Sequence, residues 1–161
     1  MKFTTPDLCD AFGPELQVAD PLLRDWGGER TFAGAIETLR VFEDNALVRQ
    51  VLETEGRGRV LVIDGGGSLR TALVGGRLAS LARDRGWSGL VINGCIRDST
   101  EIAATSLGVK ALHPAPMRSG KAGTGERGVP VRFAGVRFTP GGYLYADPDG
   151  IVVAPRDLLE R

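Results

Sequence analysis

Short apolar runs alternate with amphipathic segments over the first two thirds of the chain. The unbroken apolar runs predict buried strands, and the segments between them carry apolar residues at helical spacing. The predicted strands cover 31–41, 60–63, 90–93 and 109–112. The predicted helices cover 5–13, 45–55, 69–85 and 99–107. Strands that alternate with helices in this order pair in parallel through right-handed crossovers.

Local signals define the ends of the first helix. Thr5 is its predicted N-cap, Pro6 fits its first position and Gly13 ends it. In the longer helix over 69–85, Leu69 is among the residues that we expect to face inward.

The last third of the chain has the character of β-hairpins. A loop over 117–128, rich in glycine and basic residues, precedes three short apolar segments. These segments are 131–133, 136–138 and 151–153. Turn signals such as Pro-Gly-Gly and Asp-Pro-Asp-Gly separate them. We therefore expect residues 1–161 to form a single α/β domain with a mixed sheet.

Composition and charge exclude several classes of protein. Hydrophobic residues make up 42% of the chain and charged residues 25%, as in ordinary globular domains. Twenty basic residues balance twenty acidic ones, so we expect no direct nucleic-acid partner and no membrane partner. Arg118 and Lys121 form a local basic spot, but no aromatic residues lie between them, and we expect a solvated loop there. The two cysteines match no metal or CxxC spacing, and no apolar run has the length of a membrane span, so we expect a cytoplasmic location.

Three glycine-containing segments have some likeness to phosphate-binding loops. Segment 65–68, Gly-Gly-Gly-Ser, follows a predicted strand, but Arg70 stands where the dinucleotide fingerprint needs its third glycine. Segment 123–128 matches that fingerprint letter for letter, but a strand follows it where a helix is required. Segment 119–121 resembles the end of a P-loop, but Ala122 lacks the metal-binding hydroxyl. A nucleotide site, or methyl transfer from a nucleotide-containing cofactor, is therefore poorly supported.

The strand at 90–93 leads into the motif Arg97-Asp98-x-x-Glu101. An arginine in this place can hold an anionic substrate, and an aspartate can hold a hard divalent metal. Two carboxylates three residues apart share one side of a helical turn. The alternative is an ordinary structural Arg–Asp ion pair at the end of a strand.

The glycine pair Gly75-Gly76 lies inside the predicted helix, where each glycine costs about 1 kcal/mol relative to alanine. It indicates either the start of a helix or another group that packs closely against the backbone. Either an amide-lined pocket for a carboxylate or a tight helix–helix or subunit contact would explain it. His113, the only histidine, precedes Pro114 with no nucleophile nearby in sequence, and we expect a packing or capping role for it. We expect Cys95 to be a small buried hydrophobe.

Several linked motifs, in the same order, resemble the RraA-like family over nearly the whole chain. The family comprises the regulator of ribonuclease activity A and the class II 4-hydroxy-4-methyl-2-oxoglutarate aldolases. The motifs are Phe32-Ala33-Gly34, Val41-Phe42-Glu43-Asp44-Asn45, Val62-Ile63-Asp64-Gly65-Gly66-Gly67-Ser68, Ala72-Leu73-Val74-Gly75, Gly86-Trp87-x-Gly89, Gly94-Cys95-Ile96-Arg97-Asp98 and Leu144-Tyr145-Ala146-Asp147-x-x-Gly150.

The resemblance implies a swivelling β/β/α-type fold and a ring-shaped homotrimer with sites between subunits. It implies retro-aldol cleavage of a small 2-oxo-acid substrate, with oxaloacetate decarboxylation, through a pyruvate enolate. The implied cofactor is a divalent metal, Mg²⁺ or Mn²⁺, held by Asp98, with Glu101 as a further carboxylate close to it. Arg97 would pair with the oxo acid and offset charge as the enolate forms. The segment Gly75-Gly76-Arg77-Leu78 would present backbone amides to the pyruvyl end.

Two departures from the aldolases bear on this interpretation. Many aldolases carry an aspartate twenty-one residues before the arginine, where this chain has Gly76. The longer aldolases also supply a glutamate from a C-terminal extension, which we do not find before Arg161. The alternative function that the resemblance implies is a protein-binding regulator that inhibits an RNase E-type endoribonuclease. We favour the enzyme because the chain keeps Asp98, which a binding surface alone would not need.

Overall fold

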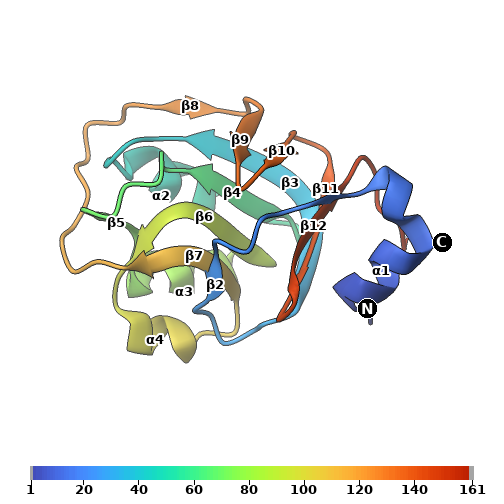
Figure 1. Cartoon of the computed structure of the whole chain (residues 1–161). Helices are drawn as coiled ribbons and strands as arrows, with labels where there is room; N and C mark the ends of the chain where they lie inside the picture. The colour runs from blue at the N-terminus through green and yellow to red at the C-terminus, as the bar shows by residue number, and fades with distance from the viewer. Residues whose placement is uncertain (1, 160–161) are drawn as a thin grey trace.

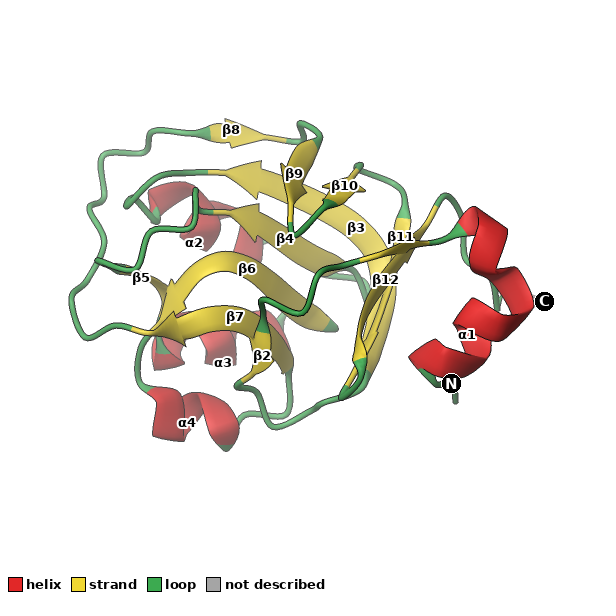
Figure 2. Cartoon of the chain, viewed as in Figure 1, coloured by secondary structure: helices red, strands yellow, loops and turns green. Residues whose placement is uncertain are grey.

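The computed structural model describes residues 2–159, which form a ten-stranded curled sheet, a separate two-stranded hairpin and four α-helices (Figures 1 and 2). The helices are α1 (Thr5–Phe12), α2 (Ala46–Leu52), α3 (Gly76–Asp84) and α4 (Ser99–Ala103), and a 3₁₀ turn covers Gly13–Glu15. The strands of the large sheet are β1 (Gln17–Val18), β2 (Arg24–Asp25), β3 (Phe32–Arg40), β4 (Val60–Asp64), β5 (Ala72–Val74), β6 (Gly89–Ile96), β7 (Gly108–Pro114), β8 (Glu126–Arg127), β11 (Tyr143–Asp147) and β12 (Gly150–Ala154). The hairpin consists of β9 (Val131–Phe133) and β10 (Val136–Phe138).

Strands β3, β4, β6 and β7 pair in parallel, and α2, α3 and α4 lie in the connections between them. The long strand β3 joins this parallel half to an antiparallel half. Its first residues pair with β11, and its last five, Ile36 to Arg40, pair with β4. Strands β12 and β1 then extend the antiparallel edge. The expected α/β class with a mixed sheet is confirmed.

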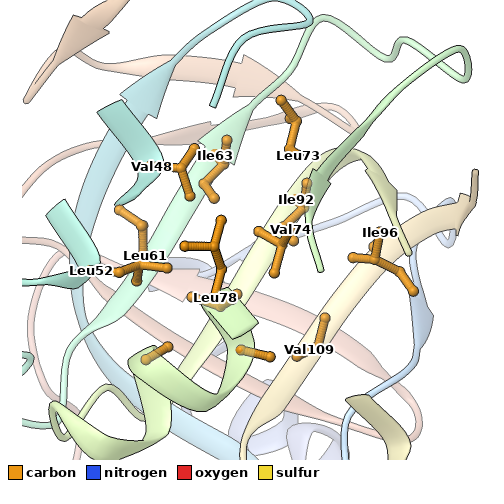
Figure 3. Close-up of a cluster of buried hydrophobic side chains, with 14 of the residues drawn as sticks. Val48, Leu52, Leu61, Ile63, Leu73, Val74, Leu78, Ile92, Ile96 and Val109 are labelled. Atoms are coloured by element: carbon orange, nitrogen blue, oxygen red, sulfur yellow. The ribbon is translucent and has the colours of Figure 1, made fainter. Parts of the chain in front are cut away.

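One hydrophobic core fills the space between the parallel strands and helices α2 and α3 (Figure 3). Val48 and Leu52 of α2 meet Leu61 and Ile63 of β4 there, and all four side chains are fully buried. Burial of each such side chain stabilises the fold by about 1.5–3 kcal/mol. The helix predicted over 45–55 is confirmed over Ala46–Leu52, and its apolar residues Val48, Val51 and Leu52 are buried.

A second core lies on the opposite face of the sheet, under the hairpin β9–β10. Phe133 and Phe138 stack there with ring centroids 4.5 Å apart. A smaller third cluster lies between α1 and the strands β11 and β12. In Figure 2, α1 lies beyond β11 and β12, apart from the other three helices.

The helix predicted over 69–85 is wrong in its first half. The chain instead forms β5, which pairs with the end of β6 through Ala72–Cys95 and Val74–Ile96 contacts. Helix α3 begins only at Gly76, and Leu69 is 63% exposed rather than inward-facing. The short Ala-Leu-Val run is compatible with either structure, and only pairing with β6 decides for a strand.

The N-cap of α1 is Thr4 rather than Thr5, since the Thr4 hydroxyl accepts the Asp7 N–H at 3.1 Å. Thr5 is buried and has a different role. Its N–H and its hydroxyl donate to the two carboxylate oxygens of Asp147, each at 2.7 Å. These bonds fasten α1 to the turn between β11 and β12.

Candidate functional site

The parallel strands all end at one edge of the sheet, on the left of Figure 1. Ligands of open α/β sheets commonly bind outside the carboxyl ends of the strands. A cavity of about 680 Å³ lies there, between α2, the start of α3, the β6–α4 turn and the loop after β7. The residues lining it are Asn45, Ala46, Arg49, Gln50, Glu53, Ala72, Gly75, Arg77, Leu78, Arg97, Asp98, Glu101, Arg118 and Lys121.

The glycine pair starts α3 and leaves room for two carboxylates. The Gly76 N–H donates to Asp98 Oδ2 at 2.9 Å, so Asp98 occupies the N-terminus of α3. A Cβ at Gly75 would lie 2.8 Å from Asp98 Oδ2. A Cβ at Gly76 would collide with the carboxylate of Glu101 and lie 3.1 Å from Glu101 Cδ. The chain therefore places Glu101 in the space that a larger residue at position 76 would fill.

The hydrogen bond from Gly76 to Asp98 reduces the number of backbone N–H groups that segment 75–78 could offer to a substrate. The Gly76 N–H is directed to Asp98. Arg77 and Leu78 also lie in the first turn of α3, where the helix itself supplies no acceptor for their N–H groups. Both residues line the cavity.

Backbone geometry directs Arg97 and Asp98 into the cavity. The Arg97 N–H donates to Val74 O at 2.9 Å, which ties the turn to β5. Asp98 adopts a left-handed conformation with φ 56° and ψ 45°, which aspartate tolerates better than most residues, and α4 follows directly. Within residues 2–159, neither Arg97 nor Asp98 is in an ion pair, and Arg97 Nη1 has only a weak contact, 3.5 Å, with Pro116 O. The alternative of a structural Arg–Asp ion pair is therefore wrong.

The other glycine segments do not form nucleotide loops. In segment 65–68, the Asp64 carboxylate accepts the Gly66 N–H and the Asn93 amide, each at 3.0 Å, and β5 rather than a helix follows. Segment 123–128 contains the short strand β8, and strand β9 follows it. Neither has the strand–loop–helix context that phosphate binding requires.

His113 and Cys95 also lie outside the cavity lining. His113 is exposed, packs edge-on against Trp26 and contacts Pro114 O through Nδ1 at 2.7 Å. Burial raises the pKa of the Cys95 thiol, which disfavours the reactive thiolate. Both findings agree with the packing roles predicted for these residues.

The sequence did not identify the wall opposite α3 and α4. Asn45, Arg49 and Gln50 from the α2 region line the cavity beside Arg118 and Lys121 from the loop after β7. That loop was expected to be merely solvated. Its two cations within a glycine-rich stretch were the available signal, but only the folded chain brings them to the cavity.

The donor set suits one kind of metal. Within residues 2–159 no three His, Cys, Asp or Glu side chains gather as a metal site. Asp98 Oδ1 accepts no hydrogen bond there, and Asp98 and Glu101 are both exposed along the cavity. Magnesium is commonly held by one or two carboxylates and several waters, whereas structural zinc needs four protein ligands. The residues present therefore fit Mg²⁺ or the similar Mn²⁺.

The carboxyl edge of the parallel strands thus carries two carboxylates and guanidinium groups without ion pairs, a set of groups that suits the binding of small anions. The chain belongs to the RraA-like family (Aldolase/RraA), whose model matches residues 5–153. A relative from Azotobacter vinelandii is 53% identical over 158 residues, covering 98% of each chain. One from Alkalilimnicola ehrlichii is 52% identical over 160 residues, covering 99% of each. Both carry the name "Putative 4-hydroxy-4-methyl-2-oxoglutarate aldolase".

Two solved structures share the fold. The first, from Geobacillus kaustophilus, is described as an S-adenosylmethionine:2-dimethylmenaquinone methyltransferase; it is 53% identical, covers 99% of each chain and has a TM-score of 0.97. The second is the RNA-processing inhibitor RraA of Thermus thermophilus, with 49% identity, coverage of 97% of this chain and 94% of that one, and a TM-score of 0.94. No helix within residues 2–159 is long and apolar enough to cross a membrane.

Proposed function

We propose that the protein is a divalent-metal-dependent aldolase that cleaves 4-hydroxy-4-methyl-2-oxoglutarate, or a related 4-hydroxy-2-oxo acid, to pyruvate. We include oxaloacetate decarboxylation, because both reactions pass through the enolate of pyruvate. The observation that carries the proposal is that Arg97 and Asp98 open into one cavity without pairing with each other. The names of the relatives that are about half identical to the chain support the aldolase class.

The chain's own groups suit the charge changes of this reaction. Cleavage of the C3–C4 bond leaves its electron pair on pyruvate as an enolate, while the C4 hydroxyl gives its proton to water and becomes a carbonyl. Uptake of a proton from water at C3 then converts the enolate to pyruvate. The Arg97 guanidinium, which extends from a backbone tied to Val74, would offset the negative charge that grows on the C2 oxygen. The N–H groups of Arg77 and Leu78, at the positive end of α3, would orient the C1 carboxylate.

Asp98, through Oδ1, would hold the metal, and Glu101 would bind its water ligands from the space beside Gly76. When bound, a divalent metal supplies Lewis-acid polarisation of a 2-oxo group. The Gly76 N–H fixes the orientation of the Asp98 carboxylate for this purpose.

We include self-assembly into a homotrimer in the proposal, together with a cytoplasmic location. Phe42, Leu69 and Met117 are 54%, 63% and 62% exposed, respectively, and come from three loops at the carboxyl edge of the sheet. Exposed apolar side chains in loops at one edge of the sheet suit contact with another subunit. Light scattering after size exclusion measures the mass, and a monomer at micromolar concentration would contradict this part of the proposal.

The test is pyruvate release from 4-hydroxy-4-methyl-2-oxoglutarate and from oxaloacetate with Mg²⁺, with Mn²⁺ and with a chelator. Asp98→Asn should lower kcat by about 100-fold or more, because an amide oxygen can still accept the Gly76 N–H but cannot replace the charge. The exposed Asp84→Asn, on α3, is the matched control. Mn²⁺ binding, measured by electron paramagnetic resonance, should weaken in parallel. Release no faster than with free metal would refute the proposal.

A second candidate is a regulator that binds and inhibits an RNase E-type endoribonuclease. The likeness to the RNA-processing inhibitor of Thermus thermophilus favours it. Pull-down and inhibition assays with an RNase E-type enzyme distinguish the two, since Asp98→Asn should leave a binding surface intact while it removes catalysis. No binding at micromolar protein would exclude the regulator.

A further inference from the structure

The cavity is far larger than a three-carbon acid requires. At about 680 Å³ it has room for on the order of twenty water molecules, each with a share of about 30 Å³. The groups assigned above to pyruvate and metal lie on α3 and the β6–α4 turn. The opposite wall, formed by α2 and the loop after β7, has no role in that assignment.

The charges along the cavity do not balance. Arg49 and Glu53 neutralise each other in an ion pair at 3.0 Å. The remaining lining cations are Arg77, Arg97, Arg118 and Lys121, and the remaining lining anions are Asp98 and Glu101. Within residues 2–159, none of these four cations is in an ion pair. The surplus of two positive charges attracts an anion beyond those the protein supplies.

The backbone that carries Arg118 and Lys121 is fixed between them. Ser119 is buried, with 3% exposed, and its hydroxyl donates to Ala72 O at 2.7 Å. The Gly120 N–H donates to Glu43 O at 2.8 Å. Both cationic side chains therefore extend from a loop whose backbone is held in place along the cavity.

The buried carboxylate of Asp44, only 4% exposed, holds the two parts of this wall together. It accepts the N–H groups of Ala122 and Gly123 from the loop, at 2.5 and 3.1 Å. It also accepts the Ala46 N–H at the start of α2, at 3.2 Å. One side chain thus sets the position of Lys121 relative to α2.

We propose that Arg118 and Lys121 form a subsite for the second carboxylate of a dicarboxylic 2-oxo acid, and that Asp44 is its positioning residue. The inference rests on the proposed function and names the residues that bind the second carboxylate of its substrate. The subsite would bind the carboxylate of the fragment that is released when the C3–C4 bond breaks. Arginine can bind a carboxylate through two parallel hydrogen bonds, and lysine adds a mobile positive charge.

Binding by calorimetry, without turnover, tests the subsite. 2-Oxoglutarate and 2-oxovalerate have the same chain length, but only the first carries a second carboxylate, and neither has the C4 hydroxyl that cleavage needs. With Mg²⁺ present, the native protein should bind 2-oxoglutarate at least tenfold more tightly. In Arg118→Gln/Lys121→Met this preference should fall below threefold, while Arg132→Gln, an exposed cation on β9, should keep it. No preference in the native protein, or a preference that survives in the double variant, would overturn the proposal.

Two further measurements separate the roles. Asp44→Asn should reduce the preference for the dicarboxylate, whereas a purely structural role would weaken the binding of both acids alike and so refute positioning. If the native protein shows the preference but releases no pyruvate, the subsite stands and the aldolase proposal fails. If cleavage occurs, KM for 4-hydroxy-4-methyl-2-oxoglutarate should rise at least tenfold in the double variant, with a smaller effect on kcat. An equal effect on both parameters would count against a binding role.

Discussion

Replacing Asp147 by asparagine should destabilise the protein strongly at neutral pH and much less in acid. Asp147 is 5% exposed, and its carboxylate accepts the Thr5 N–H and hydroxyl at 2.7 Å each and the Asp149 N–H at 3.0 Å. Burial raises the pKa of the Asp147 carboxyl, but these bonds and the Gly150 N–H outweigh it, so the pKa lies below the usual value. The carboxylate therefore stabilises the fold in its charged form.

The size of the stability loss follows from the hydrogen bonds that the asparagine amide cannot make. Asparagine retains one acceptor oxygen and presents an NH₂ group where Thr5 now donates. A hydrogen bond to a charged group contributes about 1.5–3 kcal/mol, and a buried donor left without an acceptor costs about 1–3 kcal/mol. We therefore expect a loss of about 3 kcal/mol, or roughly 6–12 °C in Tm for a chain of this length.

The lowered pKa of Asp147 determines how this stability difference changes with pH. Because the folded pKa is depressed, the stabilisation is fully present above the unfolded pKa of about 3.9 and is lost as pH falls through the folded pKa. The difference in unfolding free energy between native and Asp147→Asn proteins should be constant from pH 7 to pH 5 and shrink below about pH 4. Urea unfolding at fixed protein concentration measures it, with the exposed Asp149→Asn as control. A difference under 1 kcal/mol at pH 7, or one that does not change with pH, would refute the reasoning.

Three further predictions address packing and reactivity. Gly76→Asp should lower Tm by at least about 2 °C because its side chain displaces the Glu101 carboxylate, and adding Glu101→Ala should restore most of the loss; additive losses would contradict the shared space. Gly108→Ala should cost about 1–3 kcal/mol in urea unfolding, since the added Cβ would collide with the ring of Phe32; an unchanged midpoint would contradict it. Burial raises the pKa of the Cys95 thiol, so a thiol reagent at pH 8 should modify only the other cysteine until urea is added, and two rapid reactions per native chain would contradict that.

The parallel core of the fold could be predicted from local sequence. The apolar runs that became β4 and β6 can be buried on both faces, and the helical spacing of apolar residues predicted a helix where α2 forms. The Arg97-Asp98 motif was assigned to the end of a strand for the same reason. Each of these features depends on residues close together in the chain.

Other features were decided only by long-range contacts. Whether residues 72–74 become helix or strand depends on pairing with β6, and whether Thr4 or Thr5 caps α1 depends on Asp147, which is 142 residues from Thr5. The glycine pair was expected to mark either a helix start or a close approach to the backbone, and the structure shows both. Helix α3 starts at Gly76, and the Glu101 carboxylate fills the space that a side chain at Gly76 would occupy.

The site shows the same division. The sequence by itself determined the chemistry available at Arg97, Asp98 and Glu101, because residue type and strand-end position are local properties. Only the tertiary structure brought Arg118 and Lys121 to the same cavity. The reason is that their loop is held by hydrogen bonds to Asp44 and Ala72, and the energy of such bonds depends on distances that the order of residues alone does not fix.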